Sequence, residues 1–183
     1  MRLRTRIAVF LTLTVLLLVP TIGMASDLET REAQNEVAID FGMPIFLNVA
    51  ASVSGGYAIP LYLNYQQVLT RHLTLSVSPS VAFLQQIYRQ VMQLTLWLEL
   101  DWHPFQDGLR GFFLGPAIAF LYVRDNISSP DTTVSVGGTV GYQFLLPANL
   151  DIDVGLGLAY GLLQTYSTQP VIPRAVLALG YRF

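Results

Sequence analysis

The sequence predicts an all-β protein, an eight-stranded antiparallel up-and-down transmembrane β-barrel that is preceded by a cleavable signal peptide. Three observations lead to this fold class. The chain of 183 residues is 52% hydrophobic but only 12% charged, about half the charged fraction of an ordinary soluble domain. Beyond residue 26 the hydrophobic residues alternate with small or polar ones, as in strands with one apolar face. The first 25 residues have the layout of an export signal.

The export signal has a charged, an apolar and a cleavable part. Three arginines lie in the first six positions, residues 7–19 form an apolar run, and residues 23–25 supply small side chains for cleavage after Ala25. A run of about 13 apolar residues is too short for a membrane-spanning helix, which needs about 20. We therefore expect a signal peptide over residues 1–25, a short periplasmic tail over 26–35 and the barrel over 36–183.

Turn-forming residues divide the mature chain into eight segments with the alternation of strands. The pattern is clearest in the third segment, where Leu73, Leu75 and Val77 alternate with Thr74 and Ser76. The predicted strands span residues 36–50, 56–69, 72–85, 90–103, 111–124, 132–145, 149–164 and 174–183.

The two faces of these strands indicate which solvent each one meets. The apolar face carries no charge in the core of any strand, whereas the opposite face is small and polar, as with Gly155, Gly157 and Ala159. A soluble core could not be built from glycine and alanine beneath a surface of leucine. Leucine facing lipid and small residues lining a narrow lumen resolve this conflict, and only a closed barrel pairs all strand backbones in lipid. A soluble lipocalin-like binder would need the two faces reversed.

The end of the chain carries a family resemblance. Residues 176–183 (VLALGYRF) alternate and end on phenylalanine, which resembles the C-terminal signal read by the outer-membrane barrel-assembly machinery, with Tyr181 and Phe183 as its aromatic residues. Residues 98–105 (LELDWHPF) and 111–119 (GFFLGPAIA) are also similar to small eight-stranded bacterial outer-membrane barrels, the OmpA-, OmpX-, OmpW- and PagL-type group.

The resemblance implies a location and a set of partners. The chain would lie in the cell outer membrane with both termini in the periplasm, in contact with outer-membrane lipid and with the barrel-assembly machinery during biogenesis. We expect a monomer. The resemblance concerns architecture, which does not by itself transfer a function.

Eight ionisable residues are predicted to line the lumen in its periplasmic half. They are Asp40, His72, Glu99, Asp101, His103, Asp151, Asp153 and Arg182. A hairpin centred near residues 87–88 would place His72 opposite His103 and Thr74 opposite Asp101, close enough in principle for a shared metal ion. We favour a solvated polar rim without a metal, in which water reaches the carboxylates and Arg182 forms a salt bridge with Asp40 or Glu99.

Trp97 is the candidate for a constriction of the lumen. An eight-stranded barrel is normally just filled by its own side chains, and the last four strands contribute mostly glycine and alanine to the inner face. Trp97 would fill the space that these small residues leave. Without that filling, a narrow cavity that prefers cations would remain.

Composition and motifs narrow the function classes. A formal charge of −2 leaves no surplus of cations for a nucleic acid, and zero cysteines exclude a thiol nucleophile or a cysteine-ligated zinc. We expect a structural role or a narrow passive pore with a polar, acidic lumen, and no enzyme, catalytic residue or cofactor. The alternative is an OmpW-like barrel that binds or passes small hydrophobic molecules. A PagL-like lipid A-modifying enzyme is less favoured, because no His-x-Ser motif occurs and both histidines map to the periplasmic rim.

Overall fold

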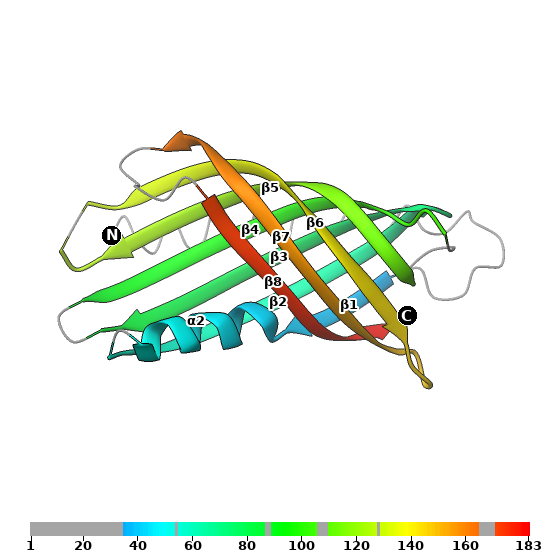
Figure 1. Cartoon of the computed structure of the whole chain (residues 1–183), viewed down its shortest axis with the longest axis horizontal. Helices are drawn as coiled ribbons and strands as arrows, with labels where there is room; N and C mark the ends of the chain where they lie inside the picture. The colour runs from blue at the N-terminus through cyan, green and yellow to red at the C-terminus, as the bar shows by residue number, and fades with distance from the viewer. Residues whose placement is uncertain (1–34, 54, 87–88, 106–109, 128, 165–170) are drawn as a thin grey trace.

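The computed structural model describes residues 35–53, 55–86, 89–105, 110–127, 129–164 and 171–183. These residues form a closed antiparallel barrel in which each strand pairs with the next and β1 pairs with β8 (Figure 1). The predicted signal peptide (residues 1–25) and residues 26–34 of the predicted tail lie outside the described residues. The predicted fold class, an eight-stranded antiparallel barrel, is confirmed.

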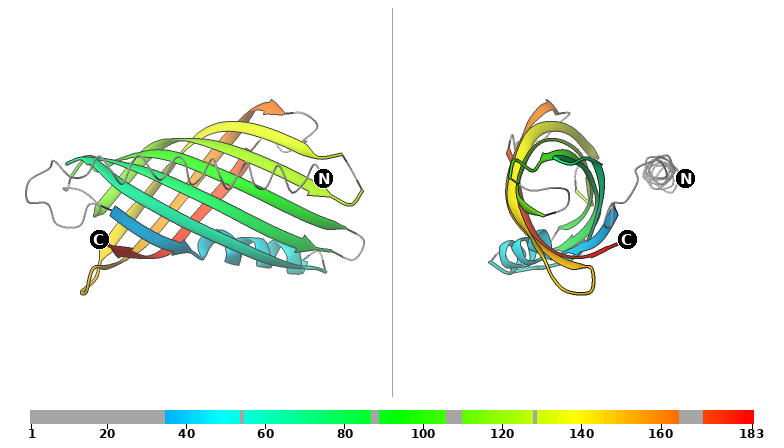
Figure 2. Two further views of the ribbon diagram at one scale, coloured as in Figure 1. Left: turned by 180° about the vertical axis from the view of Figure 1, so that it is seen from behind. Right: turned by 90° about the vertical axis from the view of Figure 1, so that its right-hand side faces the viewer.

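Eight strands and one helix build this barrel. In chain order they are β1 (Asn35–Asp40), α2 (Gly42–Val53), β2 (Tyr57–Thr70), β3 (Leu73–Gln85), β4 (Gln90–Trp102), β5 (Gly111–Asp125), β6 (Asp131–Leu145), β7 (Leu150–Gln164) and β8 (Val171–Arg182). Viewed along its long axis, the molecule is a ring of strands (Figure 2, right). The end of the ring that holds Asn35 and Phe183 is called the terminal rim below.

The polar face of the strands points into the barrel and the apolar face points outward, as the alternation predicts. In the β3–β4 hairpin Thr74 lies opposite Asp101 and Ser76 opposite Glu99, and all four of these side chains are buried. On the outer face of β7 the side chains of Leu156, Leu158 and Leu162 are 59–69% exposed. An apolar surface that runs around a whole barrel is the surface that lipid covers.

The predicted first strand, residues 36–50, is wrong after Asp40, where the chain turns into α2. Pro44 cannot donate to a strand ladder but is tolerated in the first turn of a helix. The apolar residues of this segment also repeat every four positions, as Phe41, Ile45, Val49 and Val53, and all four are exposed. The segment therefore fits a helix with one lipid-facing stripe as well as it fits a strand.

The helix takes the place that the rest of β1 would have in the wall. Strand β1 pairs with residues 63–67 of β2 and 178–182 of β8, and beyond these residues α2 lies against both strands (Figure 1). A Cβ on Gly42 would lie 2.7 Å from the backbone nitrogen of Leu177, so glycine is needed at this close approach. Among the described residues, no helix is long and apolar enough to cross a membrane.

Side chains at this seam replace the missing strand ladder. The carboxylate oxygen Oδ1 of Asp40 accepts hydrogen bonds from the backbone nitrogens of Gly42 (2.8 Å) and Leu177 (3.2 Å). On the other side of the helix, Oδ1 of Asn48 accepts from the backbone nitrogen of Ala58 on β2 (3.1 Å). Asp40, predicted as a lumen-lining residue, is thus buried at the end of β1 and joins the helix to β8.

Replacing Asp40 tests this seam. Asp40→Ala leaves two backbone N–H groups without their acceptor and is expected to lower the free energy of unfolding by about 2–4 kcal/mol. Asp40→Asn keeps the acceptor oxygen and should lose less than half as much. Urea unfolding of the refolded protein in detergent micelles measures both variants. Equal losses in the two variants would show that the charge of Asp40, and not its hydrogen bonds, stabilises the seam.

Candidate functional site

The lumen holds two clusters of polar side chains. The central cluster consists of Ser78, Trp97, Glu99, Thr139 and Arg174. The rim cluster consists of Glu36, Gln66, Gln143, Asp151, Asp153 and Arg182 and lies near the terminal rim. All of these side chains are buried, as expected for the polar interior of a transmembrane barrel.

Arg174 crosses the lumen in the central cluster. It starts on β8, and its Nη1 lies 3.0 Å from Oε2 of Glu99 on β4, the strand opposite β8 in the ring of eight. Its Nη2 donates to the hydroxyl of Ser78 on β3 (3.0 Å). The hydroxyl of Thr139 on β6 donates to the other carboxylate oxygen of Glu99. Four strands are therefore connected through the middle of the barrel.

Trp97 fills the lumen beside this ion pair. Its ring packs against Ala117, Ala119 and Ala159, and its side chain is only 4% exposed. The Cζ atom of Arg174 lies 5.1 Å from the centroid of the ring, within the range of a cation–π contact. The small residues on β5 and β7 leave the room that the indole occupies, which is the position expected for a constriction.

Hydrogen bonds from two glutamines organise the rim cluster. The Nε2 atom of Gln143 donates to Oε2 of Glu36 (2.7 Å) and to Oδ2 of Asp151 (3.0 Å). The Nε2 atom of Gln66 donates to Oδ2 of Asp153 (3.0 Å). Residues from β1, β2, β6 and β7 thus meet in one place.

Arg182 pairs with Asp151 (3.4 Å) and with Glu36 (3.7 Å), so the expected bridge to Asp40 or Glu99 is wrong. The reason is the register of β1 and β8, which sets Glu36 opposite Arg182 and Asp40 opposite Ala178. Four residues along a strand amount to about 13 Å, beyond the reach of this guanidinium.

The carboxylates are buried in the structure, whereas we expected them at a solvated rim. Glu99, Asp101, Asp151 and Asp153 are each at most 4% exposed, because Trp97 and the network around it fill the lumen. Of the eight ionisable residues predicted to line the lumen, His72 is the exposed one, in the turn between β2 and β3.

The two histidines lie together at the terminal rim, but their ring nitrogens have other partners. Nδ1 of His72 is 3.0 Å from the carbonyl oxygen of His103, and Nδ1 of His103 is 3.3 Å from that of Arg110. Nε2 of His103 therefore accepts from the hydroxyl of Thr74 (3.2 Å). His103 follows the end of β4, and burial lowers the pKa of its imidazole. Among the described residues, the group that could hold a metal ion contains neither histidine.

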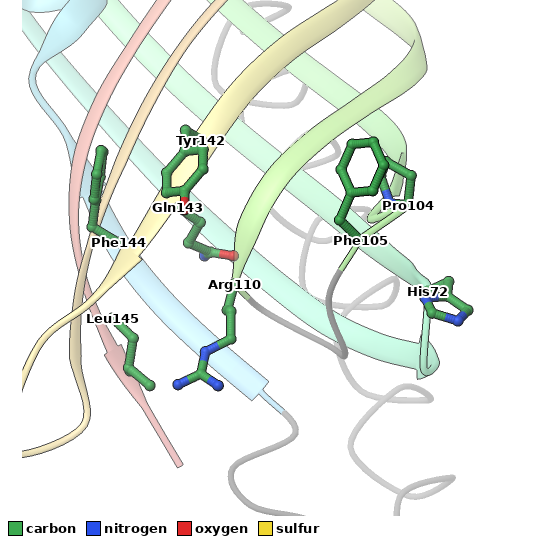
Figure 3. A pocket seen from close by; sticks show the side chains of 8 residues that line it. All are labelled: His72, Pro104, Phe105, Arg110, Tyr142, Gln143, Phe144 and Leu145. Carbon is green, nitrogen blue, oxygen red and sulfur yellow. The ribbon is translucent and has the colours of Figure 1, made fainter.

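A pocket of about 680 Å³ opens at the terminal rim (Figure 3). Its lining includes His72, Phe105, Arg110, Tyr142 and Gln143. Gln143 belongs to both the pocket and the rim cluster, so the pocket leads from the terminal rim towards the buried carboxylates.

Sequence reasoning missed Glu36, Gln66, Gln143 and Arg174. The alternation contains the signal for each of them. Glu36 has the same parity as Asp40, and Arg174 has the same parity as Arg182. Gln143 follows the inward-facing Thr139 by four residues. Gln66 has the same parity as the buried Asn64, so following each inward face along the whole strand would have found all four residues.

No protein-family model and no curated protein matches the sequence, but two solved structures are similar to this one. The solved structure of Neisserial surface protein A is similar at 11% identity, over 82% of this chain and 96% of that chain, with a TM-score of 0.47. The Yersinia pestis outer membrane protein Ail, solved in a phospholipid bilayer nanodisc, is similar at 14% identity, over 83% of this chain and 100% of that chain, with a TM-score of 0.48. Both likenesses concern the fold alone.

Breaking the central ion pair should destabilise the barrel strongly. Arg174→Met leaves the buried Glu99 without its cation and is expected to cost about 3–5 kcal/mol in the free energy of unfolding. The double variant Glu99→Gln with Arg174→Met should recover most of this loss, because no buried charge remains unpaired. Arg89→Met is the control, since Arg89 is half exposed in its pair with Asp125, and its loss should stay below about 1 kcal/mol. A single-variant loss as small as that of the control would contradict the prediction.

Proposed function

We propose that this chain is an integral outer-membrane β-barrel with a structural role, and that its lumen is closed to solutes. The observation that carries the proposal is the crossing of the lumen by Arg174, with Trp97 packed beside it. A passive pore needs a continuous polar channel, whereas here the ion pair and the indole occupy the middle of the barrel.

Two features of the outer surface support a membrane location. The strands β3 to β7 have 13–15 residues, and at a tilt of about 40° thirteen residues cover about 33 Å, enough for an apolar band of about 25 Å. Aromatic side chains are exposed near both ends of the barrel, as in the belts of membrane barrels. Trp102, Phe144, Tyr181 and Phe183 lie near the terminal rim, and Tyr57 and Phe83 near the opposite end.

Features of the sequence support the proposed location in the outer membrane and the proposed partners. A signal peptide over residues 1–25 and a terminal Tyr181–Arg182–Phe183 segment suit an outer-membrane barrel that is folded by the barrel-assembly machinery. The terminal rim would then face the periplasm. Outer-membrane lipid is the expected surrounding of the apolar face, and we expect a monomer because the strands already close the ring.

The residues inside the barrel fit the two alternative functions less well. Binding or passage of small hydrophobic molecules needs apolar space inside the barrel, but the described interior holds many charged, amide and hydroxyl side chains, and Trp97 fills the space beside its small residues. A lipid-modifying enzyme needs a hydroxyl and an imidazole that substrate can reach. Thr74 and His103 are in contact, yet Thr74 is fully buried.

Flux through liposomes tests the closed lumen. Liposomes that carry the refolded mature protein are expected to release small cations no faster than empty liposomes do. Trp97→Ala should raise this flux several-fold, because removal of the indole opens the space beside Arg174. The control is Trp102→Ala, which removes a tryptophan from the lipid-facing side and should leave the flux unchanged. Cation flux through the unaltered protein would contradict the proposal and favour the narrow pore.

A further inference from the structure

We propose that the rim cluster binds a hard divalent cation, Ca²⁺, through the carboxylates of Glu36, Asp151 and Asp153. Each of these residues offers an oxygen, and the three oxygens lie within 4.8 Å of one another. Two ligands of one calcium ion, each 2.3–2.6 Å from it, are at most about 5 Å apart. One ion can therefore reach all three side chains.

Unpartnered oxygens give an independent reason for a ligand at this place. Four buried oxygens of the rim cluster accept no hydrogen bond from the described residues, namely Oε1 of Glu36, Oδ1 of Asp151, Oδ1 of Asp153 and Oε1 of Gln143. A buried acceptor without a partner costs about 1–3 kcal/mol, and more when it is charged. Gln143 is 2% exposed and its amide nitrogen donates to Glu36 and Asp151, so its unpartnered oxygen is part of an amide that already faces two of the carboxylates. With the three carboxylates ionised, a cation would satisfy oxygens that no donor among the described residues satisfies.

The backbone leaves space where two of these oxygens converge. Oδ1 of Asp151 and Oε1 of Glu36 are the closest atoms to the point that a Cβ on residue 180 would occupy, the latter at 2.6 Å. Residue 180 is glycine and lies opposite Asp151 in the β7–β8 register. Any larger residue there would push the two carboxylates apart, so Gly180 permits the convergence.

The charge of the cluster matches a divalent ion. When ionised, the three carboxylates carry three negative charges, and Arg182 supplies one positive charge at 3.4 Å from Asp151 and 3.7 Å from Glu36. A net charge of two negatives in a buried site is costly unless it is compensated. A divalent cation neutralises it, whereas a monovalent one does not.

The donor chemistry selects the kind of ion. The cluster contains carboxylate and amide oxygens and no imidazole or thiolate, which suits Ca²⁺ or Mg²⁺ rather than zinc. Several carboxylates placed irregularly fit Ca²⁺, because Mg²⁺ demands near-octahedral geometry and retains its water. Rotation of the Gln143 amide would exchange its oxygen and nitrogen and could add a fourth protein ligand.

The pocket at the terminal rim supplies a route for the ion. Gln143, Arg110 and Tyr142 all line it (Figure 3). A hydrated cation can enter the pocket from the side that would face the periplasm and exchange water for the carboxylates of the rim cluster.

Calorimetric titration of the refolded mature protein with CaCl₂, in detergent at pH 7.5 after treatment with a chelator, tests the site. We expect saturable binding of one Ca²⁺ per chain with a Kd of about 10⁻⁴–10⁻³ M, as in extracellular calcium modules. Asp153→Asn and Glu36→Gln, two nearly isosteric changes, should each weaken this binding at least tenfold. Saturating Ca²⁺ should also raise the urea midpoint of the unaltered protein, and this shift should disappear in both variants.

Asp101→Asn is the matched control. Asp101 is also a buried lumen carboxylate with an unpartnered oxygen, but it lies outside the group of three, so its variant should bind Ca²⁺ as the unaltered protein does. The absence of saturable binding up to 10 millimolar (about tenfold above the weaker of the expected constants) would overturn the proposal. Equal weakening by Asp101→Asn would overturn it too, since general lumen charge would then explain the binding.

Discussion

The structure depends on one constraint, that every backbone N–H and C=O group in a wall facing lipid must find a partner within the protein. Strand ladders meet this requirement from β2 to β8. The exception is the stretch beyond Asp40, where β1 ends and the edges of β2 and β8 face a helix. The carboxylate of Asp40 and the amide of Asn48 accept hydrogen bonds from these edges. The sulfur of Met43 also accepts from the backbone nitrogen of Ala175 on β8 (3.3 Å), so closure of the barrel rests on these three side chains as well as on strand pairing.

The same constraint produces an interior unlike that of a soluble protein. Because the apolar side chains face outward, the space inside is filled by small residues, by Trp97 and by polar networks. Glycines decide where these networks fit, since a Cβ on residue 115 would lie 2.7 Å from Oδ1 of Asp101, much as Gly180 makes room in the rim cluster. The central cluster ties opposite strands together, while the rim cluster leaves acceptors unsatisfied. This difference separates a structural role from a candidate binding site.

Much of the fold could be predicted because period-two alternation is a local property. It shows which face of each strand points to lipid and, through the hairpin register, which neighbours on β3 and β4 meet, such as Thr74 and Asp101. The helix α2 could not be predicted in this way. Its apolar residues fit a period of two and a spacing of four equally well, so packing beside β8, close to Leu177, decides between strand and helix.

The sequence by itself therefore determined a lipid-facing barrel with an acidic inner face, because these properties follow from composition and alternation. Only the tertiary structure decided which inward-facing groups meet. Glu36 contacts Gln143, Asp151 and Arg182 because β1 pairs with β8 at the other end of the chain, and Arg174 reaches Glu99 because β4 and β8 lie opposite each other in the ring. Closure of the ring brings these residues together. A local sequence pattern cannot predict which residues meet across the lumen.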